Sequence, residues 1–179
     1  MQPVAVLGGD DKLLAAARTG DQAGFERLIE PHIAVGYRLA AAMLNDAAQA
    51  EDAVQEATLR AWRSIGQLRS SAQIRGWFLT IVANRCRSMR RARWWSAIPL
   101  PEARLGLRSP ADTVDQREDL TKALSRLSPE ERAAVFLRFY EDLNSREVAE
   151  ALGITATAAR TRIHRALRRL RVDLREEGL

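Results

Sequence analysis

The chain has 179 residues, 46% of them apolar, and 28 basic against 23 acidic side chains give it a formal net charge of +5. This length allows one or two small domains with a core. One cysteine and two histidines exclude a disulfide framework and a cysteine- or histidine-rich metal site, so we expect no cofactor. The sequence has no apolar run of the ~18 residues that span a membrane and no signal-peptide pattern, so we expect a cytoplasmic protein without membrane contact of its own.

Arginine dominates the basic side chains, because Lys12 and Lys122 are the only lysines. The planar guanidinium carries donors that suit phosphate groups and base edges. Codon bias in a GC-rich genome explains the same excess equally well. The arginine content alone therefore leaves the function open.

The chain begins with a short stretch, residues 1–10, that we expect to be disordered. Apolar side chains then recur at helical spacing, as they do between Phe25 and Ala40. Pro31 falls inside this run and is expected to kink or split it, because proline lacks an amide hydrogen and clashes with the preceding turn. The helical pattern continues to Trp95, and we assign residues 11–96 to a first domain.

The next amphipathic segment begins at Asn45 or Asp46, since either residue suits the N-cap position. Its face around Asp52 and Glu56 is acidic and polar, which is unsuited to DNA. Such a face suits a protein partner of basic or mixed charge, although an ordinary exposed helix side explains it too. The loop that follows, residues 66–73, is polar and is expected to be flexible, with room for an unpaired nucleotide.

A third segment combines an apolar stripe with a polar one. The apolar residues at helical spacing are Phe78, Val82, Cys86 and Met89, and the polar residues on the far side are Thr80, Asn84, Arg87 and Arg91. Threonine, asparagine and arginine together are typical of surfaces that contact bases and phosphates. Trp62 and Trp77 are expected in the core, because large aromatic side chains dominate small helical cores.

The composition changes after this segment. Residues 97–112 contain three prolines and one glycine and few large apolar side chains, which predicts a flexible linker. Helices resume in a second domain, residues 113–179, where two helices begin with the spacing of a capping box. The capping pairs are Ser128 with Glu131 and Asn144 with Glu147.

The last two predicted helices have the layout of a helix-turn-helix. Gly153 ends the first helix, Ile154 is expected to pack back, and Thr155 caps the second helix. An apolar stripe on the second helix faces polar and cationic residues on its other side. The stripe is Ala159, Ile163, Ala166, Leu167 and Leu170; the other side holds Thr161, His164, Arg165 and Arg168, flanked by Arg160 and Arg171. Such a helix fits the DNA major groove, and a solvated helix in a plain bundle is the alternative.

No segment alternates apolar and polar residues with period two over the length of a strand. We therefore predict an all-α fold: two small helical domains joined by a flexible linker, the second containing a helix-turn-helix.

Three stretches, in this order, resemble the extracytoplasmic-function (ECF) branch of the bacterial sigma-70 family. The first, AEDAVQEATLRAWRSI, resembles the helix of that family that binds core polymerase. The second, IRGWFLTIVANRCRSMRRAR, is similar to its helix that reads the downstream promoter element. The third runs from LSRLSPEERAAVFLRFY to RTRIHRALRRL and resembles the region that reads the upstream element. The match covers about residues 11–175.

The resemblance implies a sigma factor that binds core RNA polymerase and directs promoter recognition, local DNA melting and transcription initiation, without catalytic residues of its own. The implied polymerase contacts are Asp52, Gln55, Glu56 and Leu59. The implied downstream-element contacts are Gln67, Arg69, Thr80, Asn84, Arg87, Arg90 and Arg91. The implied upstream-element contacts are Thr155, Thr157, Arg160, Thr161, His164, Arg165 and Arg168. Many members are also held inactive by an anti-sigma factor, which makes such a protein a further candidate partner.

Two other functions fit parts of the pattern. One is an autonomous helix-turn-helix regulator with a helical sensing or dimerisation domain, but such a regulator has no need of the polar stripe between Thr80 and Arg91. The other is a helical nuclease that binds Mg²⁺ through four carboxylates, those of Asp46, Glu51, Asp52 and Glu56. No base or nucleophile accompanies these carboxylates, which argues against an enzyme.

Overall fold

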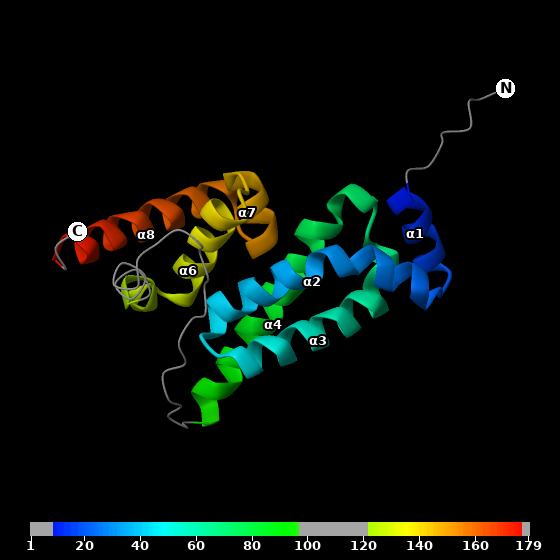
Figure 1. Cartoon of the computed structure of the whole chain (residues 1–179), viewed down its shortest axis with the longest axis horizontal. Coiled ribbons are helices and arrows are strands. Elements are labelled where there is room, and N and C mark those ends of the chain that lie inside the picture. The colour runs from blue at the N-terminus through cyan, green and yellow to red at the C-terminus, as the bar shows by residue number, and fades with distance from the viewer. Residues whose placement is uncertain (1–8, 97–121, 177–179) are drawn as a thin grey trace.

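The computed structural model describes residues 9–96 and 122–176, which form helices and no β-strand, so the all-α prediction is confirmed (Figure 1). The first domain consists of α1 (Gly9–Arg18), α2 (Gln22–Leu44), α3 (Ala47–Ser64), the short 3₁₀ helices η1 (Ile65–Gln67) and η2 (Ser71–Gln73), and α4 (Ile74–Ser96). The second domain consists of helical residues 122–126, α6 (Pro129–Val135), the π-helical turn η3 (Phe136–Tyr140), α7 (Ser145–Leu152) and α8 (Ala156–Glu176). No helix within these ranges is long and apolar enough to cross a bilayer.

The predicted domain boundaries are only partly within the described residues. Gly9 and Asp10 belong to α1 and not to the predicted disordered terminus, of which residues 1–8 lie outside the described ranges. The predicted linker, residues 97–112, and the first part of the second domain, residues 113–121, also lie outside them.

Local signals place the helices of the first domain. Asp46 is the N-cap of α3 and accepts a hydrogen bond from the Gln49 amide at 3.0 Å, whereas Asn45 ends α2 in the left-handed conformation with φ 55°. Pro31 does not split its segment, because α2 runs through it without a break. Burial of apolar side chains on both sides of the proline offsets the hydrogen bond that it removes.

Helices α2, α3 and α4 form a bundle, and α2 and α4 approach each other closely at Gly36. A Cβ at Gly36 would lie 2.9 Å from Cε1 of Phe78 and 3.4 Å from Cγ2 of Val82. The absence of a side chain therefore lets the apolar stripe of α4 reach the bundle core. Phe78, Val82 and Cys86 are fully buried there, as the stripe predicted.

Both predicted capping boxes are confirmed in the second domain. Ser128 and Glu131 exchange hydrogen bonds at the start of α6, and Asn144 and Glu147 do the same at the start of α7. Gly153 ends α7 with φ 61°, where a side chain would be strained. The turn between the last two helices is therefore the predicted glycine turn.

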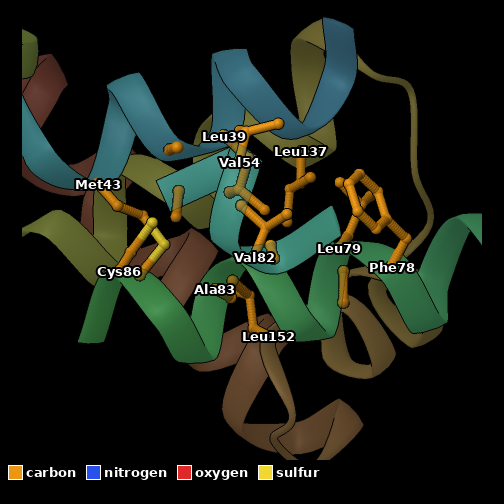
Figure 2. Packing of buried hydrophobic residues seen from close by; sticks show 14 of the residues in the cluster. Leu39, Met43, Val54, Phe78, Leu79, Val82, Ala83, Cys86, Leu137 and Leu152 are labelled. Atoms are coloured by element: carbon orange, nitrogen blue, oxygen red, sulfur yellow. The ribbon is translucent and has the colours of Figure 1, made fainter. Parts of the chain in front are cut away.

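The two domains pack against each other. Helix α7 lies against α4, and α6 lies against α2 (Figure 1). Leu137 and Leu152 of the second domain belong to the same buried cluster as side chains of α2, α3 and α4 (Figure 2). The molecule therefore has an apolar interface between the domains in addition to the cores within them.

Candidate nucleic-acid interface

The last helix separates an apolar side from a cationic side. Thr155 caps α8 by accepting a hydrogen bond from the Ala158 amide at 3.1 Å. Of the predicted stripe, Ala159, Ile163, Ala166 and Leu170 are buried, whereas Leu167 is 37% exposed. The assignment of Leu167 to the stripe is wrong, because this residue lies about 100° around the helix from Ala166, outside the part that α6 covers.

The predicted upstream-element residues share one open face of α8. Thr155, Thr157, Arg160, Thr161, His164, Arg165 and Arg168 are all exposed. Apart from the N-cap bond of Thr155, none of these side chains forms a hydrogen bond or ion pair with another described residue. Five of them line a hollow of about 880 Å³, and Arg126, Arg169, Val172 and Asp173 line it as well. This face therefore presents guanidinium groups along the first four turns of the second helix of the helix-turn-helix.

The corresponding face of α4 is only partly open. Asn84, Arg90 and Arg91 are exposed. Thr80 Oγ1 donates to the main-chain oxygen of Glu150 in α7 at 2.6 Å, and Arg87 Nη2 donates to that of Leu152 at 2.7 Å. The second domain thus occupies two of the predicted downstream-element contacts.

Carboxylates of the second domain hold the arginines of the first. Glu130 accepts hydrogen bonds from Arg87 through both carboxylate oxygens, at 3.2 and 3.4 Å, and from Arg162 of α8 at 3.2 Å. Glu141 pairs with Arg38 at 2.7 Å and with Arg75 at 2.9 Å. Three of these four arginine–carboxylate contacts join the two domains, and Arg162 with Glu130 joins α8 to α6 within the second domain. The sequence predicts none of them, because no local pattern marks partners that are far apart along the chain.

The loop before α4 is more ordered than the sequence predicted. It forms η1 and η2, and Ser71 is buried with its hydroxyl donating to Asp11 Oδ1 at 2.6 Å. Arg18 also donates to the main-chain oxygen of Leu68, which is itself buried. The prediction of a flexible loop is therefore wrong, because contacts with α1 hold it in place. Gln67 and Arg69 remain exposed on it.

The predicted polymerase-docking face lies on the exposed side of α3. Asp52 and Gln55 are exposed, and Leu59 is 55% exposed. Glu56 pairs with Arg60 at 2.8 Å and with Arg85 of α4 at 2.6 Å. Three of the four predicted residues are therefore free to meet a partner, and the fourth is held in an ion pair.

Trp62, Trp77 and Cys86 pack in or against the hydrophobic core. Trp62 is partly buried and contacts Phe25 with ring centroids 5.1 Å apart, and Trp77 is partly buried against the same core. Burial raises the pKa of the Cys86 thiol to about 12, which leaves very little thiolate at neutral pH. Within the described ranges, no three His, Cys, Asp or Glu residues are grouped as metal ligands.

Comparison with known proteins identifies the two domains. Residues 28–96 match the model of sigma-70 region 2, and residues 117–170 match the model of sigma-70 region 4. Among curated proteins, the ECF RNA polymerase sigma factor SigL of Mycobacterium tuberculosis is 32% identical over 172 residues, covering 93% of this chain and 97% of SigL. SigM of the same species is 33% identical over 177 residues, covering 94% of this chain and 88% of SigM.

Two solved structures share the fold. RpoE of Bartonella quintana, in complex with the anti-sigma factor NepR, has a TM-score of 0.71 and 23% identity, covering 84% of this chain and 96% of RpoE. CnrH, in complex with the cytosolic domain of CnrY, has a TM-score of 0.69 and 21% identity, covering 96% of this chain and all of CnrH. The family models and the curated relatives together show that this chain belongs to the ECF branch of the bacterial sigma-70 family of RNA polymerase sigma factors.

Proposed function

We propose that the two domains divide the work of this sigma factor between them. The first domain docks on core RNA polymerase through the exposed face of α3 and holds bases of the melted downstream element with α4 and residues 66–73. The second domain places α8 in the major groove of the upstream element. The observation that carries this proposal is the open face of α8, where the predicted upstream contacts lie together and uncompensated.

The proposal gives this chain no catalytic step, since the polymerase carries out the chemistry. It also places the chain in the cytoplasm, because both of its partners, core polymerase and promoter DNA, are found there in bacteria. We further propose that an anti-sigma factor regulates it. RpoE, which shares the fold, is bound to the anti-sigma factor NepR in its solved structure, and CnrH is bound to the cytosolic domain of CnrY. Isolation of the chain from its native cells in an inactive complex, and recovery of activity when the partner is removed, would support this last point.

In vitro transcription tests the main proposal. Purified chain and core polymerase are incubated with fragments of the genome, and transcript 5′ ends are mapped. We expect discrete starts that require the chain. If correctly folded chain gives no promoter-specific transcript with core polymerase on any fragment, the proposed function is wrong.

The α3 contact is tested by Asp52→Arg, which reverses a charge at the centre of the docking face. We expect about tenfold weaker binding to core polymerase and unchanged binding to duplex DNA, since opposed charges across an interface commonly contribute this much. Glu26→Arg is the matched control, because it makes the same charge reversal at an exposed carboxylate on another helix, α2. Equal losses in both variants would exclude a specific role for Asp52.

A further inference from the structure

We infer that α1 positions the loop before α4, residues 66–73, for contact with bases, and that Asp11 and Arg18 are its positioning residues. The inference rests on the proposed function, because that function lets this loop hold bases of the melted downstream element. It adds a role for a helix outside the family match, since the match to sigma-70 region 2 begins at residue 28, within α2.

Helix α1 is a fixed support for the loop. Leu14 and Ala17 are buried, and α1 packs against α2. A short turn, residues 19–21, joins the two helices, and its last residue caps α2: Asp21 accepts a hydrogen bond from the Ala23 amide at 3.1 Å. A short, capped connection between two packed helices fixes the position of α1 on the bundle.

Two hydrogen bonds join α1 to the loop, one near each end of the helix. Near the start of α1, Asp11 Oδ1 accepts from the Ser71 hydroxyl at 2.6 Å. At the last residue of α1, Arg18 donates through Nη2 to the main-chain oxygen of Leu68. The Leu68 amide donates to the Ile65 main-chain oxygen at 3.1 Å, so both main-chain polar groups of Leu68 are bonded. The helix therefore holds the loop at two separate points.

These bonds hold the inner side of the loop and leave its outer side open. Leu68 is 2% exposed and Ser71 is 9% exposed. Next to them along the chain, Gln67, Arg69 and Gln73 are exposed. The amide and guanidinium groups of these outer residues are suited to hydrogen bonds with base edges. Helix α1 thus fixes the orientation of the loop without touching a base itself.

The order of the loop in the free chain changes the cost of base contact. A flexible loop loses backbone and side-chain entropy when it binds a ligand, and the two contacts with α1 remove part of this loss beforehand. An unstacked base is recognised by hydrogen bonds of defined geometry, whereas phosphate contacts are independent of sequence. Release of the loop from α1 should therefore lower the preference among bases more than the total affinity for DNA.

Base preference separates positioning from general affinity for DNA. Holoenzyme is assembled from the full chain and core polymerase, and open-complex formation is measured on a mapped promoter and on variants of it with single changes in the downstream element. A single mismatched position commonly weakens binding by about five- to a hundredfold. We expect Arg18→Met to lower the wild-type preference about fivefold and to leave binding to core polymerase unchanged.

Two further variants of α1 show whether the Arg18 hydrogen bond is the cause. Arg18→Lys keeps a donor for the Leu68 oxygen and should restore at least about half of the lost preference. A preference no higher in Arg18→Lys than in Arg18→Met would contradict the role of this bond. Lys12→Met removes an exposed cation of the same helix and should leave the preference unchanged. If Lys12→Met has the same effect as Arg18→Met, general charge explains the loss and the inference is wrong.

The contact between Asp11 and Ser71 gives an independent test of opposite sign. Asp11→Ala removes a negative charge, so electrostatics alone would tighten DNA binding, whereas positioning predicts a lower base preference. Ser71→Ala removes the same hydrogen bond from the loop side. We expect the double variant to lose no more preference than either single variant, because all three break one contact. Additive losses would show that the two residues act separately and would overturn the proposed positioning contact.

Hydrogen exchange of the free chain tests the order of the loop itself. We expect the amides of residues 66–73 to exchange at least about tenfold faster in Arg18→Met and in Asp11→Ala, with exchange in α3 and α4 unchanged. Faster exchange throughout the first domain would contradict a positioning role, because α1 would then support the whole fold.

The outcomes distinguish this inference from the proposed function. If wild-type holoenzyme gives promoter-specific transcripts and Arg18→Met keeps the wild-type base preference, the positioning role of α1 is wrong and the sigma function stands. If wild-type holoenzyme gives no promoter-specific transcript, the proposed function fails, and the inference fails with it.

Discussion

The two helices predicted to read DNA, α4 and α8, have similar chemistry and different surroundings. Each carries threonine and arginine side chains opposite an apolar stripe. On α8 the cationic side is open, whereas on α4 Thr80 and Arg87 are bound by the second domain. The difference shows that residue type and helical spacing predict a polar face on each helix, but only packing decides whether that face is available.

The largest expected effect is on the binding of duplex DNA by the open cationic face of α8. Arg160→Ala with Arg165→Ala should weaken upstream duplex binding and lower the slope of log K against log salt by about 1.8, since each lost phosphate contact removes about 0.9. Titrations at several salt concentrations measure this slope. Arg27→Ala removes an exposed arginine on α2 and is the control. An unchanged slope in the double variant would mean that these arginines face only solvent.

On the covered face, one substitution should have two opposite effects. Arg87→Ala removes the contacts with Glu130 and Leu152, so the ratio of free chains with separated domains to free chains with packed domains should rise about fivefold. The same variant on polymerase should give less transcript, because a predicted downstream contact is lost. Scattering of the free chain and in vitro transcription measure the two effects. Arg91→Ala is the informative comparison, since Arg91 is exposed on α4 and should lower transcription without opening the chain. Opening by both variants to the same extent would contradict the role of Arg87.

The buried guanidinium predicts a stabilising substitution. Arg132 of α6 is 5% exposed; its Nη2 donates to the Leu127 main-chain oxygen at 3.4 Å, but Nε and Nη1 have no hydrogen-bond partner. Arg132→Met keeps much of the side-chain volume and removes these two unsatisfied donors and the buried charge, so the melting temperature should rise by about 2–4 °C. Calorimetry measures the rise. A fall in melting temperature would show that Arg132 contributes a favourable contact.

The smallest expected effect is the dependence of folding stability on pH. Burial, and then the charge of Arg75, lower the pKa of His32 below 6.5, and Asp10 acts in the opposite direction. The unfolded chain therefore binds this proton more readily than the folded chain, so stability should fall as the pH drops through 6.5. Thermal melts between pH 7.5 and about 5.5 should show this decrease in wild type and a weaker one in His32→Gln. Equal pH dependence in the two proteins would exclude His32 as its source.

The features that sequence reasoning predicted correctly are local ones. The capping boxes at Ser128 and Asn144 and the turn at Gly153 depend on residues only a few positions apart. The same holds for the stripes on α4 and α8, apart from Leu167. Such patterns define each helix and its apolar side before any tertiary contact is known.

The features that it missed depend on distant residues. Arg38 and Glu141 are separated by 103 positions, and Ser71 and Asp11 by 60. Neither pair has a spacing that a helix or turn imposes. The ordered conformation of residues 66–73 and the packing of the two domains against each other can therefore be read only from the tertiary structure.

A distance measurement in solution tests the central claim most directly. Donor and acceptor dyes are attached to cysteines introduced at Ala48 of α3 and Val172 of α8, both exposed, while the buried Cys86 thiol stays largely unlabelled. The account predicts a single transfer efficiency for the free chain, because the domains pack against each other, and a clear shift when core polymerase and promoter DNA are bound. A free chain that already shows the efficiency of the promoter complex would contradict it.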